Sequence, residues 1–242
     1  MVITKLLCSD IRQRAMLKML GDHIRASDVV ASSSSNFIQA IRPLIKAGFV
    51  ERDGLNSYSL TGPGRILALQ LREMIDAVEV LQDAFWRTHR LDYIPDHLLY
   101  TIGALKSGGV VAPNSHVTRA QVSFIDHVTH AKKIFGASSI YVEGYSEMIS
   151  AALDNGAEVE LILTQDVIGK IDRDIFNSWL ARPAQCKVDI REVKAAFAVA
   201  DGILFLGMFD HAGVIDLLQE WVCESERAGE WGRELFEYFL GG

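Results

Sequence analysis

The hydrophobic pattern of the first 61 residues predicts short helices followed by a hairpin. An apolar period close to that of a helix follows Ser9-Asp10, either of which can cap the first turn. A short second helix is expected near residues 26–31. The serines at 32–35 offer N-caps for a third helix that extends to Ala47, with Gly48 placed as its C-cap.

The predicted third helix has two different faces. Its apolar stripe recurs at helical spacing and consists of Phe37, Ile41, Leu44 and Ile45. The opposite face is polar, basic and free of carboxylates, and it consists of Ser35, Gln39, Arg42 and Lys46. Pro43 removes one backbone hydrogen bond, so a bend or a weak turn is expected there.

After Gly48 the pattern changes to that of a hairpin. Residues 49–52 and 57–61 are predicted to be two short strands around an Asp53-Gly54 turn. Three helices and a hairpin are the elements of a winged helix-turn-helix. In that fold the third helix enters the major groove of DNA, and the hairpin is the wing beside the backbone. Residues 1–65 are assigned to this domain.

A long helix is predicted to open at Gly62-Pro63-Gly64, where the missing N–H of the proline costs little. Its apolar positions alternate spacings of four and three, as in the seam of a coiled coil. The seam residues are Leu67, Leu71, Met74, Val78, Leu81 and Phe85. Residues 66–91 are therefore predicted to link two domains and to form a homodimer. The alternative is that the same stripe packs on the protein's own body.

Residues 92–242 are predicted to form an α/β domain. Helices are expected at residues 95–106, 117–135, 145–155, 172–180 and 225–240. Strands are expected at residues 139–142, 158–163, 187–193, 197–200, 203–209 and 215–222. Because the later strands follow one another closely, the sheet should be mixed. The fold class is α/β for this domain and α+β for the whole chain.

The composition is that of a globular protein, but the charge is unevenly distributed. With 49% hydrophobic and 23% charged residues, collagen-like and disordered classes are excluded. Residues 1–65 carry nine Lys/Arg against five Asp/Glu, a net charge of +4. Residues 66–242 carry fifteen against twenty-six, a net charge of −11. Only the basic part should be attracted to phosphates.

Neither a signal peptide nor a membrane span is expected from the sequence, which favours a cytoplasmic protein. Cys8, Cys186 and Cys223 are odd in number, far apart and without a Cys-x-x-Cys pair. This usage is typical of a reducing compartment and argues against a disulfide framework or a Cys-rich zinc site. No cofactor is expected.

Sequence-specific binding to double-stranded DNA is the function that the pattern favours. Short polar side chains, Arg and Gln on an exposed helix can meet base edges. The candidates for base contacts are Ser35, Asn36, Gln39 and Arg42. Flanking cations contact phosphates, and the candidates are Arg25, Lys46, Arg52 and Arg65. The alternative for each residue is a solvated surface position.

The sequence contains no set of residues that indicates an enzyme, and no catalytic residue is expected. The sequence contains no Gly-x-x-x-x-Gly-Lys-Ser/Thr loop, no Gly-x-Ser-x-Gly elbow and no Gly-x-Gly-x-x-Gly after a strand. Asp126, His127 and His130 have no obvious further metal ligand, so a polar helix face is favoured over a metal site. The run His130-Ala131-Lys132 begins like a phospholipase D motif, but Ala137 stands where that motif requires an aspartate.

Ten aromatic residues of the body are core residues or the lining of a pocket for a small effector, since ligand sites are mostly apolar. These residues are Trp86, Tyr93, Tyr141, Tyr145, Phe205, Phe209, Trp221, Trp231, Phe236 and Tyr238.

Several segments together carry a resemblance to a known family. They are Leu7-Cys8-Ser9-Asp10-Ile11-Arg12, residues 44–50, 58–64, 89–95, 102–105 and 206–210, and the closing Trp231-Gly232-Arg233-Glu234-Leu235-Phe236-Glu237-Tyr238. The chain resembles archaeal winged-helix transcriptional regulators of the methanogenesis regulator (FilR) type, which join an ArsR-like DNA-binding domain to an effector domain. The resemblance implies a cytoplasmic, dimeric transcription factor whose second domain senses a signal and alters DNA binding.

The sequence thus predicts a homodimeric, DNA-binding regulator with an effector-sensing domain, whose effector is a small molecule or a protein. The alternative is an α/β protein, ligand-binding or catalytic, that uses its winged helix to bind another protein.

Overall fold

The computed structural model describes residues 7, 9–21, 24–25, 34–53, 57–111 and 117–241. Its contacts divide the chain into two compact units, Met1–Asp76 and Ala77–Gly242. The boundary between the two units, after Asp76, falls within residues 66–91, the segment predicted to link two domains. The second helix, expected near residues 26–31, lies outside the described residues.

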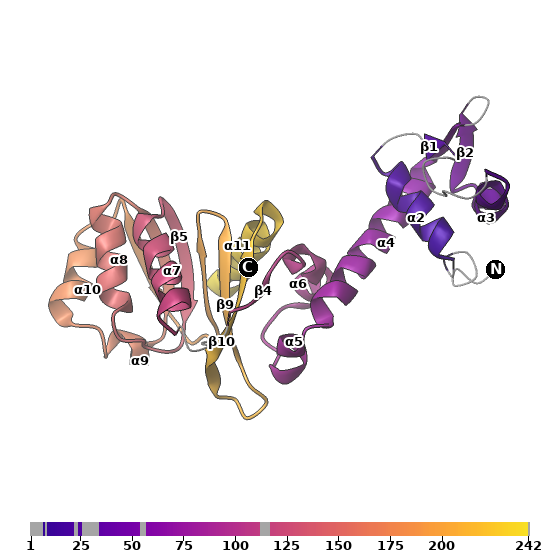
Figure 1. The fold of residues 1–242 in the computed structure, drawn as a ribbon. Helices are drawn as coiled ribbons and strands as arrows, with labels where there is room; N and C mark the ends of the chain where they lie inside the picture. The colour runs from indigo at the N-terminus through magenta and orange to yellow at the C-terminus, as the bar shows by residue number, and fades with distance from the viewer. Residues whose placement is uncertain are drawn as a thin grey trace. The chain divides into compact units, whose positions relative to one another are not determined.

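The N-terminal unit combines helices with a small antiparallel sheet (Figure 1). Its elements are α2 (Asp10–Met19), β1 (Ile24–Arg25), α3 (Ser34–Lys46), β2 (Val50–Asp53), β3 (Ser57–Leu60) and the start of α4 (Gly62–Leu81). The strand order is β1-β3-β2. The two predicted strands of the hairpin are confirmed, because Val50 pairs with Leu60 and Asp53 with Ser57. The strand β1 had not been expected.

The end of α3 follows from Gly48, which has a φ of 78°. Its amide donates to the Ile45 carbonyl at 3.0 Å, and the Phe49 amide donates to the Leu44 carbonyl at 2.9 Å. This is the Schellman arrangement, which confirms Gly48 as the C-cap. The helix continues through Pro43.

The apolar stripe of α3 is only partly as predicted. Phe37, Ile41 and Leu44 are fully buried in the core of this unit. The prediction for Ile45 was wrong, since 37% of its surface is exposed. A helix face as narrow as this one buries positions spaced by three and four, and the position one residue after Leu44 turns away from the core.

The start of α4 is held against the end of α3. The Thr61 hydroxyl donates to the Gly48 carbonyl at 2.6 Å and accepts from the Gly64 amide at 3.1 Å. A Cβ added at Gly64 would lie 1.7 Å from the Phe49 carbonyl oxygen. This close approach requires glycine at position 64.

The predicted seam of six residues is not one continuous exposed stripe. Leu71 is buried in the core of the N-terminal unit, and Leu67 packs against that core. Phe85 belongs to a separate short helix, α5 (Ala84–Thr88), and is fully buried in the C-terminal unit. Met74, Val78 and Leu81 are 55%, 52% and 40% exposed. The seam as predicted was therefore wrong for Leu71 and Phe85, because each unit buries one end of the stripe in its own core.

The C-terminal unit is built on a mixed sheet of seven strands. In spatial order these are β4 (Gly109–Val111), β10 (Ile215–Glu224), β9 (Ile203–Phe209), β8 (Ala196–Ala200), β5 (Lys133–Ser138), β6 (Glu158–Leu163) and β7 (Cys186–Ile190). The β5–β6 and β6–β7 pairs are parallel, and the other pairs are antiparallel. The mixed α/β class is thereby confirmed.

Helices cover both faces of this sheet and enclose two separate cores. On one face lie α7 (Val117–His130), α8 (Tyr145–Asp154), α9 (Gln165–Ile168) and α10 (Arg173–Leu180). On the other lie α5, α6 (Asp96–Tyr100), the 3₁₀ helix η2 (Ile102–Leu105) and α11 (Glu226–Gly241). Figure 1 shows α7, α8 and α10 grouped beside β5. Among the described residues, no helix combines the length and apolarity that a membrane crossing requires.

Around β5 the predicted boundaries were wrong. The helix expected to reach residue 135 stops at His130, and the strand expected at residues 139–142 lies at Lys133–Ser138 instead. Val128, Ala131 and Ile134 continue a helical spacing, so the period alone does not reveal the break. The break is made by Asp201, whose carboxylate accepts hydrogen bonds from the amides of Lys132 and Lys133 at 2.9–3.1 Å.

The remaining predicted elements of the body lie close to their expected places. The strands at 158–163 and 203–209 are found with those bounds. The helix expected at 95–106 is two short pieces, α6 and η2. The edge strand β4 had not been expected, because three residues are too few to show a period of two.

Candidate functional site

The outer face of α3 is the first candidate site. Gln39, Arg42 and Lys46 are all exposed on it, and the helix contains no acidic residue. The side chains of Ser35 and Asn36, also predicted to contact bases, lie outside the described residues. The described part of the face is therefore polar and cationic, as direct contact with DNA requires.

Contacts on the inner side of α3 fix this face in place. Arg12 of α2 donates from Nε to the Ala40 carbonyl at 2.7 Å. Phe37 meets Tyr58 of β3 edge to face, with ring centroids 5.7 Å apart. The helix is thus held between α2 and the hairpin, with its polar face outward.

Lys46, a candidate phosphate contact, lies on α3 itself, and the other three candidates come from other elements. Arg52 on β2 and Arg65 at the start of α4 are exposed. Arg25 belongs to β1, and its side chain lies outside the described residues.

A cavity of about 130 Å³ in the C-terminal unit is the second candidate site. It lies between the sheet and helices α7 and α8. Its apolar lining includes Phe124, Tyr145, Met148, Leu161, Val167, Trp179 and Phe197. The cavity exists because the sheet beneath it carries small residues. Ser138, Ala196 and Gly207 are register neighbours across β5, β8 and β9, and none of them fills the space above the sheet.

Glu220 brings a carboxyl group into this apolar setting. It pairs with Gly207 in the register of β10 and β9, so it lies in the same row and on the same face as the small residues. It is the one acidic residue among the described lining residues. Burial raises the pKa of Glu220 to about 7.

Tyr145 on α8 lies near enough to be affected by the charge of this carboxyl. Burial, followed by the charge of Glu220, raises the pKa of Tyr145 to about 12. Two other polar lining groups are already engaged in hydrogen bonds. The indole of Trp179 donates to the Ser150 hydroxyl at 2.9 Å, and the Ser138 hydroxyl donates to the Ile140 carbonyl at 2.7 Å.

Of the ten aromatic residues considered for a pocket, Tyr141 and Tyr145 line this cavity. Sequence reasoning missed Glu220, Phe124, Trp179 and Phe197. A signal was present in the small residues Gly136, Ser138, Ala196 and Ala198, which stand at alternate positions of β5 and β8. Small side chains on one face of a strand leave room for a ligand.

Two of the three residues considered for metal binding pair with each other. His130 pairs with Asp126 at 3.3 Å, and both side chains are exposed. Within the described ranges no group of three or more His, Cys, Asp or Glu side chains is arranged to hold a metal ion.

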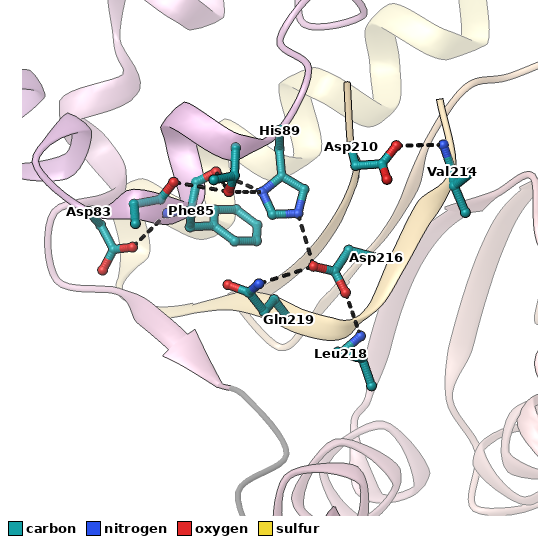
Figure 2. Close-up of polar contacts among 10 residues, drawn as sticks. Asp83, Phe85, His89, Asp210, Val214, Asp216, Leu218 and Gln219 are labelled. Atoms are coloured by element: carbon teal, nitrogen blue, oxygen red, sulfur yellow. Dashed lines mark hydrogen bonds and ion pairs between the residues drawn. The ribbon is translucent and has the colours of Figure 1, made fainter. Parts of the chain in front are cut away.

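A buried histidine connects α5 to the strand that carries Glu220 (Figure 2). His89 is 3% exposed, and its Nδ1 donates to the Phe85 carbonyl at 2.7 Å. Its Nε2 lies 3.4 Å from the Asp216 carboxylate, which also accepts from the Leu218 amide at 2.8 Å. The Asp216 segment is an irregular part of β10, where the register shifts between Ile215 and Glu220. The histidine therefore anchors the residues that directly precede Glu220.

Two family models match these two parts of the chain. Residues 117–241 match the model described as the middle domain of methanogenesis regulatory protein FilR1, and residues 2–79 match the model of its N-terminal domain. The chain belongs to the FilR1 family, which confirms the resemblance found in the sequence.

The individual proteins that resemble this chain share little sequence identity with it. The methanogenesis regulatory protein FilR1 of Methanothrix harundinacea (strain 6Ac) is 25% identical over 222 residues, which cover 87% of this chain. The chain spans about half, 50%, of the length of that relative. Among solved structures, TrmBL2, an archaeal chromatin protein, has a TM-score of 0.46 at 14% identity over 98% of this chain and 96% of its own. NucT from Helicobacter pylori has a TM-score of 0.43 at 14% identity, over 55% of this chain and 94% of its own.

Proposed function

We propose that this chain is a sequence-specific DNA-binding transcriptional regulator. Residues 1–65 act as a winged helix-turn-helix, α3 enters the major groove, and the β2–β3 hairpin is the wing. The observation that carries this proposal is the exposed, carboxylate-free face of Gln39, Arg42 and Lys46 on α3. Membership of a family described as regulatory proteins supports it.

Two isoleucines extend the proposed reading face. Ile38 is 40% exposed, and Ile45 is exposed to a similar extent. Apolar side chains on a recognition helix contact the methyl group of thymine. In this proposal Ile45 is exposed because it belongs to the DNA-binding face and not to the core.

The uneven distribution of charge along the chain also favours binding of DNA through the N-terminal unit. Residues 1–65 have a net charge of +4 and residues 66–242 a net charge of −11. The phosphate backbone attracts the first part and repels the second. In the proposed complex, DNA is therefore contacted by the N-terminal unit.

We also propose that the regulator is a homodimer that pairs through α4. Met74, Val78 and Leu81 are spaced by four and three on one side of this helix, and all are exposed. A second copy of α4 would cover them. A dimer of winged helices binds an operator with two half-sites, which increases both affinity and specificity.

The C-terminal unit is proposed to sense an effector rather than to catalyse a reaction. Among its described residues, the cavity lining contains no histidine, lysine or cysteine that could act as a base or nucleophile beside Ser138 or Ser146. The hydroxyls of both serines donate to other groups, Ser138 to the Ile140 carbonyl and Ser146 to the Glu147 carboxylate. A partly open apolar cavity with few polar groups favours binding of a small molecule.

The test of DNA binding begins with selection of fragments that the full chain binds from the genomic DNA of its source. Affinity for a selected fragment is then measured at fixed salt for a Gln39→Ala, Arg42→Ala variant. A matched control is Arg72→Ala, Gln82→Ala, which removes the same two residue types from exposed positions elsewhere. The α3 variant should bind more weakly by ~2–4 kcal/mol, and the control should bind like the unmodified protein.

The salt dependence of DNA binding distinguishes the proposed regulator from the alternative function, in which the N-terminal unit binds another protein. Binding to duplex DNA through phosphates releases counter-ions, so affinity should fall steeply as salt is added. No binding at low salt, or equal affinity of the α3 variant and its control, would refute the assignment. The first result would favour an α/β protein that uses its N-terminal unit to bind another protein.

A further inference from the structure

The cavity between the sheet and α7 and α8 combines an apolar wall with one carboxyl, that of Glu220, which has no partner among the described residues. We propose that it binds a small apolar molecule that carries a single protonated amine, with Glu220 as the counter-ion. This inference deepens the proposed sensor function and rests on it, because it names the chemical class of the effector.

The size of the cavity limits the apolar part of the ligand. A cavity of about 130 Å³ is slightly smaller than the ~150 Å³ apolar cavity that accepts benzene in another protein. A ring of six atoms, or an aliphatic chain of similar volume, therefore fits. A larger group, such as a nucleotide or a disaccharide, would not fit wholly inside this space.

The charge of the lining selects the polar part. Glu220 makes no hydrogen bond or ion pair with the described residues, and no lysine, arginine or histidine lines the cavity among them. A carboxylate in an apolar space is unfavourable unless a cation is paired with it. A protonated amine supplies that cation, whereas a carboxylate ligand would be repelled by Glu220.

The aromatic residues of the cavity favour the same ligand class. Phe124 and Tyr145 have ring centroids 5.3 Å apart, and Tyr145 lies close enough to Glu220 to be affected by its charge. Aromatic faces attract cations through their negative quadrupole. An ammonium group paired with Glu220 would thus also be stabilised by the ring of Tyr145.

Three probes that share one carbon skeleton but differ in charge test the proposed ligand class. They are added to the full chain in the absence of DNA. Benzylamine, benzyl alcohol and benzoate are titrated at pH 8 by calorimetry, with tryptophan fluorescence as a second readout. Benzylamine should bind at least about tenfold more tightly than benzyl alcohol, and benzoate should not bind. Cyclohexylamine and butylamine extend the test to aliphatic amines.

The pH dependence assigns the effect to Glu220. The other titratable groups that line the cavity are Tyr141 and Tyr145, and burial holds the pKa of Tyr145 above the tested range. Because the ionised form of Glu220 binds the amine, affinity should rise about tenfold between pH 6 and pH 8. Glu220→Gln should lose both the tight binding and the pH dependence. Glu224→Gln, an exposed position on the same strand, should keep both.

A second variant keeps the proposal testable if the Glu220→Gln variant fails to fold. Ala198→Leu keeps the carboxyl and fills the cavity, so benzylamine binding should be lost. No binding of any of the three amines at millimolar concentration would overturn the inference. So would equal binding of benzylamine and benzyl alcohol, or an unchanged Glu220→Gln variant. DNA binding by α3 is measured independently, so a failed amine test with intact DNA binding refutes the ligand class alone.

Discussion

Glu220 and Trp221 are consecutive residues of β10, and the pleat of the strand points their side chains to opposite faces of the sheet. Glu220 pairs with Gly207 and lines the cavity, whereas Trp221 pairs with Leu206 in the other core. There Trp221 packs against Trp86 of α5, with ring centroids 5.3 Å apart. A change at the cavity can thus reach α5 through one peptide bond and the packing of Trp221 on Trp86.

We predict that an amine in the cavity changes the surroundings of Trp221. Benzylamine should shift or quench the tryptophan fluorescence of a Trp179→Phe variant, which no longer has a tryptophan in the cavity wall. The reason is that the ligand repositions Glu220, and the neighbouring peptide carries the change to Trp221. A Trp179→Phe, Trp221→Phe variant is the control and should lose this signal. A signal that survives in the control would mean that the change does not pass through Trp221.

We predict that the stability of the C-terminal unit depends on pH through Glu220. The pKa of Glu220 in the folded protein is raised to about 7, from an ordinary value of 4.5. The folded state therefore holds the proton more tightly than the unfolded state, and stability should fall as the pH rises from about 4.5 to about 7. The loss should be ~1–3 kcal/mol, because the side chain is only partly exposed.

Urea unfolding followed by tryptophan fluorescence measures this effect. The four tryptophans, Trp86, Trp179, Trp221 and Trp231, all belong to the C-terminal unit, so the signal reports that unit alone. Glu220→Gln should unfold with a free energy that lacks this decline. Identical pH profiles of the variant and the unmodified protein would contradict the prediction.

We predict that His89 holds the α5 region to the sheet. His89→Ala removes the hydrogen bond to the Phe85 carbonyl and leaves Asp216 without its partner on α5. The free energy of unfolding should fall by ~2–4 kcal/mol, measured by urea and tryptophan fluorescence. His211→Ala, at an exposed position whose ring contacts the Arg87 carbonyl, is the control and should change stability by less than about 1 kcal/mol. Equal losses in the two variants would show that burial of His89 is unimportant.

We predict that Gly64 is required for the N-terminal unit and that Gly62 is not. Gly64→Ala places a Cβ 1.7 Å from the Phe49 carbonyl oxygen, so the start of α4 must shift. A Cβ at Gly62 meets nothing within 4 Å. Because this unit has no tryptophan, hydrogen exchange of α3 is the measurement. Protection should fall by ~2 kcal/mol or more in Gly64→Ala and remain near the original value in Gly62→Ala.

We predict that a charge at Val78 breaks the proposed dimer. Val78→Asp places a carboxylate in the patch of Met74, Val78 and Leu81, which a second copy of α4 would cover. Sedimentation should show monomers at micromolar concentration. Arg72→Asp puts the same side chain on the far side of α4 and should remain dimeric. Dimers in the Val78→Asp sample would exclude this face as the interface.

The local pattern predicted elements well where one face of an element is buried along its whole length. The strands at Glu158–Leu163 and Ile203–Phe209 and the C-cap Gly48 were found as predicted, because period and cap chemistry are local properties. The turn between β8 and β9, which was not predicted, also depends on local chemistry. Asp201 and Gly202 both have positive φ, as the Asp-Gly pair of a tight hairpin requires.

Prediction failed where distant residues decide the outcome. The helix expected to reach Phe135 stops earlier, because Asp201 binds the amides of Lys132 and Lys133. The stripe on α4 is divided, because Leu71 and Phe85 are buried in different cores. Neither contact leaves a trace in the local hydrophobic period.

The sequence by itself determined the order of the elements, the mixed α/β class of the body and the polar face of α3, since these depend on the spacing of neighbouring residues. Only the tertiary structure decided that Glu220 enters an apolar cavity. That position requires the small residues Gly207, Ala196 and Ser138 to meet in one row across three strands. The register between strands is set by packing and hydrogen bonds over long distances in the chain, and no local pattern contains it.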